Sequence, residues 1–344
     1  MGYPTCGQCQ TRGAMLKLSS MFGLSLNRWP PAQTLRYHID QNALRLVVHG
    51  HKELSSHPET LRRRLVLFAH YDPQDQIDPY VVYYLRQLHE LGSEILFVSG
   101  STELTKAACA PIDPLCSGIY TTRNLSLDFG SWNVAWQLLR CKGWVLDDFD
   151  QLILANDSVY GPLFPLAELL SSVGDADLFG ATESEEIMPH LQSYFLIFRL
   201  NAKTRAFLEE FWSNFRYVLS KRKLIWRYEF GISRLARERG LSAQAFVPNA
   251  TARSVALSMS DHPYREELVA GNVNNTLYLW DTMIEGLRFP FLKTDIPRVN
   301  RYQSARLATL TEFLAKHTTY PPHLIEDNLR RLGVVLPSRD GSIS

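Results

Sequence analysis

The chain has 344 residues, 45% of them hydrophobic and 21% charged, and its formal net charge at pH 7 is +1. This composition is typical of a globular protein with a sizeable core, and the length suits two domains or one large α/β domain with appendages. The near-zero net charge argues against a general polyanion binder, so we expect no nucleic-acid partner.

The first 63 residues form a basic N-terminal extension in which Arg and Lys far outnumber Asp and Glu. Large apolar residues, among them Met15, Phe22 and Trp29, are interleaved with its cations. The pattern fits a solvated arm or a helix packed on the core. It also fits a segment in peripheral contact with the anionic inner face of the plasma membrane.

Five cysteines make a sparse, odd-numbered set, which suits a reducing compartment better than a disulfide framework. Cys6 and Cys9 have the CxxC spacing but lack a second pair at zinc spacing, which disfavours a metal or redox role. No apolar run approaches the ~20 residues of a membrane span, and no secretory signal is recognisable. We therefore expect a cytoplasmic protein.

A strand-helix alternation follows the extension. Compact apolar runs predict strands at 64–72 and 94–99, and Pro79 and Gly92 bound a helix over 79–91 between them. A strand, a helix and a strand in this order predict a right-handed βαβ unit.

Further along, a weak strand at 118–121 precedes the polar, glycine-containing loop 123–133, which enters a helix over 134–140. Such a loop can present backbone N–H groups and side-chain oxygens to a nucleotide.

The most informative stretch is 149–163, where the apolar run Leu152-Ile-Leu-Ala155 ends in Asn156-Asp157-Ser158 and then turns at Gly161-Pro162. An apolar run bounded by turn formers predicts a buried strand of a parallel sheet. Ligands of open α/β sheets bind beyond the carboxyl ends of the strands, so this carboxylate is a candidate site for a metal-bound phosphate. The alternative is an Asx cap of the turn.

The remaining pattern completes an α/β core over 64–250 and predicts a mostly helical C-terminal region over 251–344 that packs on it. The predicted later elements are helices at 163–173, 204–218, 228–239, 274–285, 303–316 and 322–332, and strands at 177–180, 190–199 and 243–247.

Six stretches in one order carry a family likeness: LVLFAHYD, RNLSLDFGSW, DQLILANDSVYGPLFPL, HLQSYFLIF, YEFGISRL and PFLK. Together they span about residues 64 to 300, and the chain resembles the rhamnan synthesis protein F family of bacterial surface polysaccharide synthesis. The resemblance implies a GT-A-like, Rossmann-type α/β fold with a mostly parallel sheet flanked by helices. It also implies an inverting glycosyltransferase that moves a deoxyhexose such as rhamnose from a nucleotide sugar to a growing or lipid-linked glycan.

Residue by residue, the likeness places Asn156-Asp157-Ser158 where GT-A enzymes have the Asp-x-Asp motif, and Tyr228-Glu229 where they have the pair carrying the catalytic base. Both motifs depart from the pattern, because each has one acidic residue where many relatives have two. If no metal binds, Arg or Lys must compensate the charge of the diphosphate instead, and Arg123 and Lys293 are the nearest candidates.

Glycosyl transfer needs charge compensation for the departing diphosphate, recognition of the nucleotide, and a base for the acceptor hydroxyl. Asp157 is the predicted catalytic metal ligand, holding Mg²⁺ or Mn²⁺ through hard oxygen donors, and Glu229 at a helix N-terminus is the predicted base. The predicted nucleotide-sugar-binding residues are Asp72, Arg123, Asn124, Asp128, Asn156, Ser158 and Lys293. His190 and Gln192 are predicted to line the acceptor side.

Each of these residues also has a structural interpretation, such as Asp72 as a turn cap or His190 as a satisfied core histidine. Two other classes of protein compete with the enzyme. The first is a non-catalytic nucleotide-sugar-binding or glycan-assembly subunit with a degenerate acidic motif. The second is an α/β hydrolase or phosphatase, which is disfavoured because no nucleophile elbow is present.

Overall fold

The computed structural model describes residues 47–52, 63–142, 144, 146–260, 262–271, 273–300 and 305–337. Leu46–Ser344 belongs to one compact unit. Most of the basic N-terminal extension lies outside the described residues, and so do the membrane-contacting segment expected there and the Cys6–Cys9 pair.

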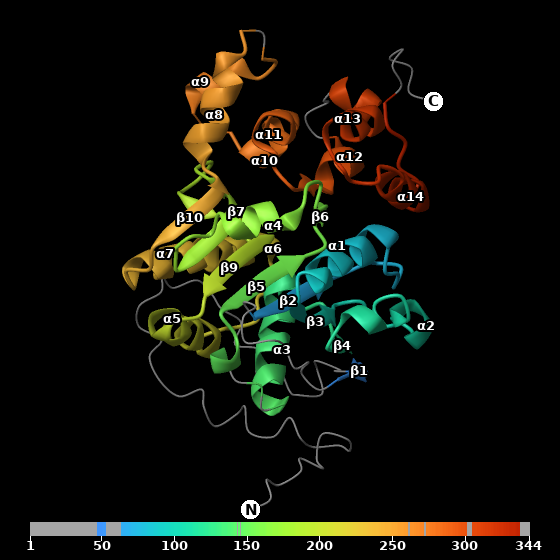
Figure 1. The fold of residues 1–344 in the computed structure, drawn as a ribbon, viewed down its shortest axis with the longest axis vertical. Coiled ribbons are helices and arrows are strands. Elements are labelled where there is room, and N and C mark those ends of the chain that lie inside the picture. The colour runs from blue at the N-terminus through green and yellow to red at the C-terminus, as the bar shows by residue number, and fades with distance from the viewer. Residues whose placement is uncertain are drawn as a thin grey trace, which may run out of the picture. The chain divides into compact units, whose positions relative to one another are not determined.

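The described residues contain a nine-stranded sheet with the order β1-β4-β3-β2-β5-β9-β7-β10, and β8 pairs with β7 beside this path (Figure 1). The strands of the central run β4-β3-β2-β5 are parallel, whereas β9 is antiparallel to both of its neighbours and β1 is antiparallel to β4. A second sheet pairs β6 with β11. The strands are β1 Val47–His51, β2 Arg64–His70, β3 Ser93–Ser99, β4 Gly118–Thr121, β5 Gln151–Asn156, β6 Val159–Tyr160, β7 Leu178–Ser184, β8 His190–Leu191, β9 Phe195–Arg199, β10 Ala243–Val247 and β11 Leu292–Lys293.

Helices connect these strands and make up most of the described chain beyond β10. The α-helices are α1 Pro79–Glu90, α2 Lys106–Cys109, α3 Leu127–Lys142, α4 Leu166–Ser171, α5 Ala202–Ser213, α6 Lys221–Leu224, α7 Phe230–Glu238, α8 Asn249–Ser258, α9 Arg265–Ala270, α10 Asn275–Tyr278, α11 Trp280–Leu287, α12 Asp295–Val299, α13 Leu310–His317 and α14 His323–Arg331. The shorter helical turns are η2 Asp113–Leu115, η3 Leu146–Asp148, the π-helical η4 Ile225–Glu229 and η5 Ala305–Thr309.

The sheet reverses its direction of growth between β2 and β5. From β2 the chain passes through α1 to β3 and on to β4, whereas α3 carries it back to β5 on the other side of β2. Right-handed crossovers in opposite directions put α1 and α3 on opposite faces of the sheet. The carboxyl ends of β2 and β5 therefore form the topological switch point, where open α/β sheets bind ligands.

Alternating side chains of the central strands supply two hydrophobic layers. Val66 and Phe68 of β2 pack in one cluster with Tyr84 and Leu85 of α1. The alternate residues of β2 face the opposite side, towards α3. Because both faces are covered, the middle residues of both strands are apolar without alternation, from Leu65 to Ala69 in β2 and from Leu152 to Ala155 in β5. The predicted mixed α/β architecture with a mostly parallel sheet is confirmed.

The C-terminal helices join the cluster on the α1 face. Trp280 of α11, Phe313 of α13 and Leu329 of α14 are buried in it. Tyr320, just before α14, meets Tyr83 of α1 edge to face, with ring centroids 5.1 Å apart. In Figure 1 these helices, drawn in orange and red, lie on the side of the sheet that carries α1.

Several predicted boundaries are wrong. The loop predicted over 123–133 is helical from Leu127, because Gly130 lets the first turn of α3 lie against Leu125. The strand predicted over 190–199 breaks at a turn after Leu191 and resumes at Phe195. The helix predicted over 163–173 is confined to Leu166–Ser171, and the helix predicted over 204–218 ends at Ser213.

Candidate functional site

Asp157 lies at the switch point, immediately after β5. Its Oδ2 accepts a hydrogen bond of 3.0 Å from the backbone N–H of Tyr71, which follows β2. The Tyr80 hydroxyl of α1 donates to the backbone oxygen of Asp157 at 2.9 Å. His70 Nε2 is 3.7 Å from Asp157 Oδ2. Groups from β2 and α1 thus fix the carboxylate at the edge where the two strands end.

Asn156 connects this edge to the first turn of α3. Its buried side chain donates from Nδ2 to Asp128 Oδ2 at 2.8 Å. Its Oδ1 accepts from the Ser158 hydroxyl at 2.6 Å and from the Ser158 backbone N–H at 3.2 Å. The polar triplet Asn156-Asp157-Ser158 therefore both caps its turn and orients Asp128.

Asp128 stands in the first turn of α3 and not in a preceding loop. The chain enters the helix through left-handed conformations at Ser126 (φ 64°) and Leu127 (φ 48°). Non-glycine residues in this conformation are strained, and such strain is concentrated at functional sites. This entry directs Asp128 towards Asn156.

Burial opposes the ionisation of both aspartates. Burial, together with the charges of Asp157 and Glu229, raises the pKa of Asp128 to about 7, although the hydrogen bond from Asn156 and the charge of Lys221 act to lower it. Burial also raises the pKa of Asp157 to about 7. The hydrogen bond from the Tyr71 N–H and the charge of Arg298 act in the opposite direction and lower this pKa. Asp128 is thus close enough to both Asp157 and Glu229 for their charges to act on its ionisation.

Glu229 is the last residue of the π-helical turn η4, which continues from α6 and leads into α7. The expectation that it begins a helix is wrong, because helical geometry starts at Lys221, so no helix N-terminus stabilises its charge. Its Oε1 instead accepts from the Ser193 backbone N–H at 3.2 Å. Single π-helical turns within helices are frequent at functional sites.

The acceptor-side candidates Gln192 and His190 are both buried. Gln192, one residue before Ser193, accepts from the Thr182 hydroxyl at 2.7 Å and donates to Asn274 Oδ1 at 3.3 Å. His190 Nδ1 lies 2.8 Å from the Met188 backbone oxygen, and its ring packs against Phe230 with centroids 4.5 Å apart. Gln192 thereby shapes the turn that holds Glu229, whereas His190 is a packed core histidine.

Asp72 belongs to a different set of contacts. Its Oδ1 accepts from the backbone N–H groups of Gln74 at 2.9 Å and Gln76 at 3.3 Å, and its Oδ2 is 2.5 Å from Arg331 Nη2. Arg331 also pairs with Asp78 at 2.6 Å. The carboxylate of Asp72 therefore caps its turn and ties that turn to α14.

The other predicted nucleotide-binding residues lie around the same edge of the sheet. Arg123 is exposed after β4, and Asn124 packs over Gly100, which follows β3. Lys293 is on β11 beside Val159, with Nζ 5.2 Å from the centre of the Tyr194 ring.

The sequence analysis did not identify Arg298, whose positive charge lowers the pKa of Asp157. Arg298 donates from Nε to the Tyr160 hydroxyl at 3.2 Å, and from Nη2 to Asn328 Oδ1 at 2.9 Å and to the Tyr80 hydroxyl at 3.3 Å. Among the described residues it forms no ion pair with a carboxylate. No local pattern marks Arg298, because its partners come from α1, β6 and α14.

His70 is a second residue that was missed. Burial lowers its pKa to about 4, so it is neutral at pH 7, and its Nδ1 lies 2.8 Å from Ser99 Oγ. Ser99 Oγ also accepts the Ser101 N–H at 3.0 Å.

The donor set suits a divalent ion shared with a substrate. Across the described ranges, neither Asp128 nor Asp157 forms an ion pair with Lys or Arg, and no group of three or more His, Cys, Asp or Glu side chains is arranged to hold a metal. Mg²⁺ sites that include substrate phosphates commonly use only one or two protein carboxylates. The residues present fit that kind of site and not a metal site made only of protein ligands.

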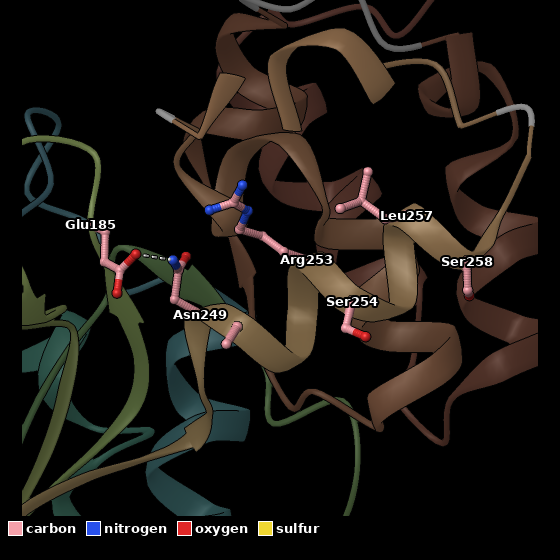
Figure 2. A pocket seen from close by; sticks show the side chains of 7 residues that line it. Glu185, Asn249, Arg253, Ser254, Leu257 and Ser258 are labelled. Atoms are coloured by element: carbon pink, nitrogen blue, oxygen red, sulfur yellow. Dashed lines mark hydrogen bonds between the residues drawn. The ribbon is translucent and has the colours of Figure 1, made fainter. Parts of the chain in front are cut away.

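A separate hollow of about 530 Å³ runs along α8 (Figure 2). Glu185, Arg253 and Leu257 are among its lining residues, and Glu185 accepts from Asn249 Nδ2 at 2.8 Å. None of the predicted site residues lines this hollow.

Comparisons with solved structures and with curated proteins give matches that cover different shares of this chain. A cytidylyltransferase structure from Leptospira borgpetersenii matches 61% of this chain and 93% of its own, with 11% identity and a TM-score of 0.33, which is too low to carry an argument. The virulence protein VirA of Vibrio anguillarum is 25% identical over 199 residues, or 54% of this chain. The chain spans 64% of the length of that relative. Within the part of the chain that the structure describes, no helix is long and apolar enough to cross a membrane.

The model of the rhamnan synthesis protein F family matches residues 95–337, which is most of the sheet, all three carboxylates and the C-terminal helices. The family is one of polysaccharide synthesis. On this match, the chain belongs to the rhamnan synthesis protein F family.

Proposed function

We propose that this protein is an inverting glycosyltransferase of the GT-A type. It transfers a deoxyhexose, such as rhamnose, from a nucleotide-diphosphate sugar to a growing polysaccharide or lipid-linked glycan. The observation that carries the proposal is the placement of Asp157 and Asp128 where the sheet reverses direction, joined through Asn156, with Glu229 near enough for its charge to act on Asp128. Membership of a polysaccharide-synthesis family supports it.

The donor diphosphate lies at the carboxyl ends of β2 and β5. Mg²⁺ or Mn²⁺ held by Asp157, with Asp128 behind it, would supply positive charge to the leaving diphosphate. Ser158 and Asn156 keep the two carboxylates in place through the contacts of the turn. Burial strengthens this electrostatic interaction, because water screens it less.

Arg298 supplies a second positive charge to the diphosphate. The two tyrosine hydroxyls and Asn328 hold its guanidinium, and a fixed guanidinium is well suited to phosphate oxygens. Lys293 and Arg123 remain candidates at the edge of the same site. Asp72 has a structural role in this proposal, because Arg331 and its own turn occupy its carboxylate.

Glu229 acts as the general base. The acceptor hydroxyl oxygen attacks the anomeric carbon, the bond from that carbon to the diphosphate oxygen breaks, and the hydroxyl proton moves to Glu229. Attack from the face opposite the leaving group inverts the anomeric configuration. The Ser193 N–H holds one carboxylate oxygen in place for this step.

The test compares Glu229→Gln and Asp157→Asn with the unaltered protein. A thermal-stabilisation screen of nucleotide sugars identifies the donor, and radiolabelled sugar is then followed into envelope glycan and lipid fractions. Glu229→Gln is expected to lower kcat by ~10²–10⁴ while donor affinity is kept. Asp157→Asn is expected to weaken donor binding and to remove its dependence on Mn²⁺.

Glu209→Gln is the matched control, because Glu209 is half-exposed and pairs with Arg140 on the surface. Full transfer by either site variant would refute the corresponding role.

A non-catalytic nucleotide-sugar-binding subunit is the second candidate. The single carboxylate of Asn156-Asp157-Ser158 favours it. Calorimetry that detects nucleotide binding by the unaltered chain, together with no consumption of any donor, would support this candidate over the enzyme.

A further inference from the structure

The segment from the end of α5 into η4 combines exposed apolar side chains with cations. Residues 211–228 contain five Lys and Arg residues and no Asp or Glu. Leu219 is 66% exposed and Trp226 is 55% exposed. Lys221, Arg222 and Lys223 lie between them and are all exposed. We call this surface, from Leu219 to Trp226, the basic-apolar surface.

The basic-apolar surface borders the carboxylate site. At its start, the Ser126 hydroxyl donates to the Val218 backbone oxygen at 3.0 Å and also accepts from the Val218 N–H. The cation of Lys221 acts on Asp128 and lowers its pKa. At its end, η4 carries both Trp226 and Glu229. The surface therefore adjoins Asp128 on one side and Glu229 on the other.

The exposed side chains stand on an ordered backbone. The Tyr228 hydroxyl donates to the Arg216 backbone oxygen at 2.5 Å, and the Arg216 N–H donates to the same hydroxyl at 2.6 Å. The ring of Trp226 meets Phe230 edge to face, with centroids 5.3 Å apart. Trp226 therefore contacts Phe230 with part of its ring, while more than half of the residue is exposed to solvent.

A basic run alone is most often a solvated face. A solvated face gives no reason to expose a tryptophan and a leucine on either side of three cations. Tryptophan is enriched where one part of a side chain is apolar and another is wet, at the level of lipid headgroups. Lys and Arg are attracted to the anionic surface of a bilayer.

We propose that the basic-apolar surface docks on an anionic lipid bilayer, with Leu219 and Trp226 at the headgroup level and Lys221, Arg222 and Lys223 against anionic headgroups. We infer an anionic bilayer as the partner because the three cations complement its charge and because the exposed tryptophan and leucine suit its headgroup region. Docking in this way brings η4, which carries both Trp226 and Glu229, to the bilayer. Delivery of a lipid-linked acceptor to Glu229 rests on the proposed function, whereas the docking itself does not.

The experiment is co-sedimentation of the full chain with vesicles. One set consists of phosphatidylcholine alone, and the other is an equal mixture of phosphatidylcholine and phosphatidylglycerol. The variants are the double substitutions Leu219→Ser with Trp226→Ser, and Arg222→Gln with Lys223→Gln. Lys221 is left intact because its charge acts on Asp128.

The unaltered protein is expected to bind the mixed vesicles, and to bind them less as salt is added. Loss of the two cations lowers the partition coefficient roughly 30-fold, since each adds about 1 kcal/mol near an anionic surface. Loss of Leu219 and Trp226 lowers it at least as far and removes quenching of tryptophan fluorescence by brominated lipid. The apolar control is Met259→Ser with Val269→Ser, both exposed, and the charge control is Lys106→Gln with Lys316→Gln.

Two results would overturn the proposal. One is that the unaltered protein does not bind the mixed vesicles. The other is that both double variants bind as the unaltered protein does, which would assign binding to another region such as the basic N-terminal extension. Donor binding measured by calorimetry without vesicles reports separately on the proposed function.

Discussion

Asp128 and Asp157 both change protonation near neutral pH, because burial and neighbouring negative charge oppose their ionisation. A carboxylate in such a place costs stability when it is charged. The same arrangement attracts a cation that relieves the repulsion. The charged carboxylates thus lower the stability of the folded protein, and the same carboxylates form a site that attracts a cation.

Asp128→Asn is expected to stabilise the protein in a pH-dependent way. The ordinary pKa of the Asp128 carboxyl is 3.8 and its folded value is about 7, so the folded state binds the proton more tightly. The stability from that protonated carboxyl is complete below about pH 4 and is lost as the pH rises to about 7. The Asn variant keeps the hydrogen bond from Asn156 and should gain on the order of 3 kcal/mol relative to the unaltered protein at pH 8.

Urea unfolding at pH 5 and pH 8, without divalent ions, measures this gain. Glu209→Gln serves as the control and should show no such difference between the two pH values. An equal effect of Asp128→Asn at both pH values would mean that the folded protein does not raise the pKa of Asp128.

At the scale of single elements, β5 was predictable and η4 was not. The apolar run before Asn156 marks a buried strand, and the polar triplet after it marks the strand end, so Asp157 follows from the local sequence. Glu229 was identified by family likeness, but its place in a π-helical turn leaves no local signal. Arg298 and His70 were missed because tertiary contacts alone bring them to Asp157.

The start of α3 shows how packing overrides local preference. Gly130, Ser131 and Asn133 favour a loop, since glycine and small polar residues are poor helix formers. Phe129 and Trp132 are buried nonetheless, and the Trp132 Nε1–H donates to the Ala155 backbone oxygen at 3.0 Å. Burial of these rings on the sheet extends the helix back to Leu127.

Gly130→Ala should be strongly destabilising for this reason. A Cβ on Gly130 would lie 1.6 Å from the Leu125 backbone oxygen, so the strained entry to α3 would have to move. Overpacking typically costs about 1–3 kcal/mol and occasionally more, and a contact with backbone, which cannot move aside as a side chain can, favours the upper end. Thermal unfolding of the purified variant measures the loss.

Gly231→Ala is the matched control, because Gly231 is also helical and nothing lies within 4 Å of a Cβ built there. That substitution should raise stability by about 0.5–1 kcal/mol. If the two variants had the same stability, the close approach of Leu125 would have no energetic importance.

At the scale of the whole unit, one buried residue of α14 connects distant segments. Asn328 is fully buried, accepts from the Tyr160 hydroxyl at 2.5 Å and from Arg298, and donates to Asp78 at 2.7 Å. The C-terminal helices are thereby coupled to α1 and, through Arg298, to the carboxylate site. The sequence predicted that these helices exist, but it could not predict this coupling.

Asn328→Ala is expected to lower the free energy of unfolding by about 3 kcal/mol, because it leaves several buried polar groups unpaired. It should also weaken the binding of nucleoside diphosphates more than that of monophosphates, since Arg298 loses an acceptor that orients it. Chemical denaturation and calorimetry measure the two effects. Asn300→Ala, at the end of α12, is the comparison. If the variant lost the same affinity for diphosphates as for monophosphates, Arg298 would not be a ligand of the diphosphate.

The pairing of Asp72 and Asp78 with Arg331 also bears on how the chain is made. The ribosome completes β2 and α1 long before it reaches α12 and α14, so the nascent chain holds two aspartates without their cation and lacks Arg298 altogether. A messenger that ends translation before α12 would yield a chain with the central strands and all three carboxylates. Such a product would lack Arg298, whose charge acts on Asp157, and Arg331, which pairs with Asp72 and Asp78, so the proposed diphosphate site would be incomplete in it.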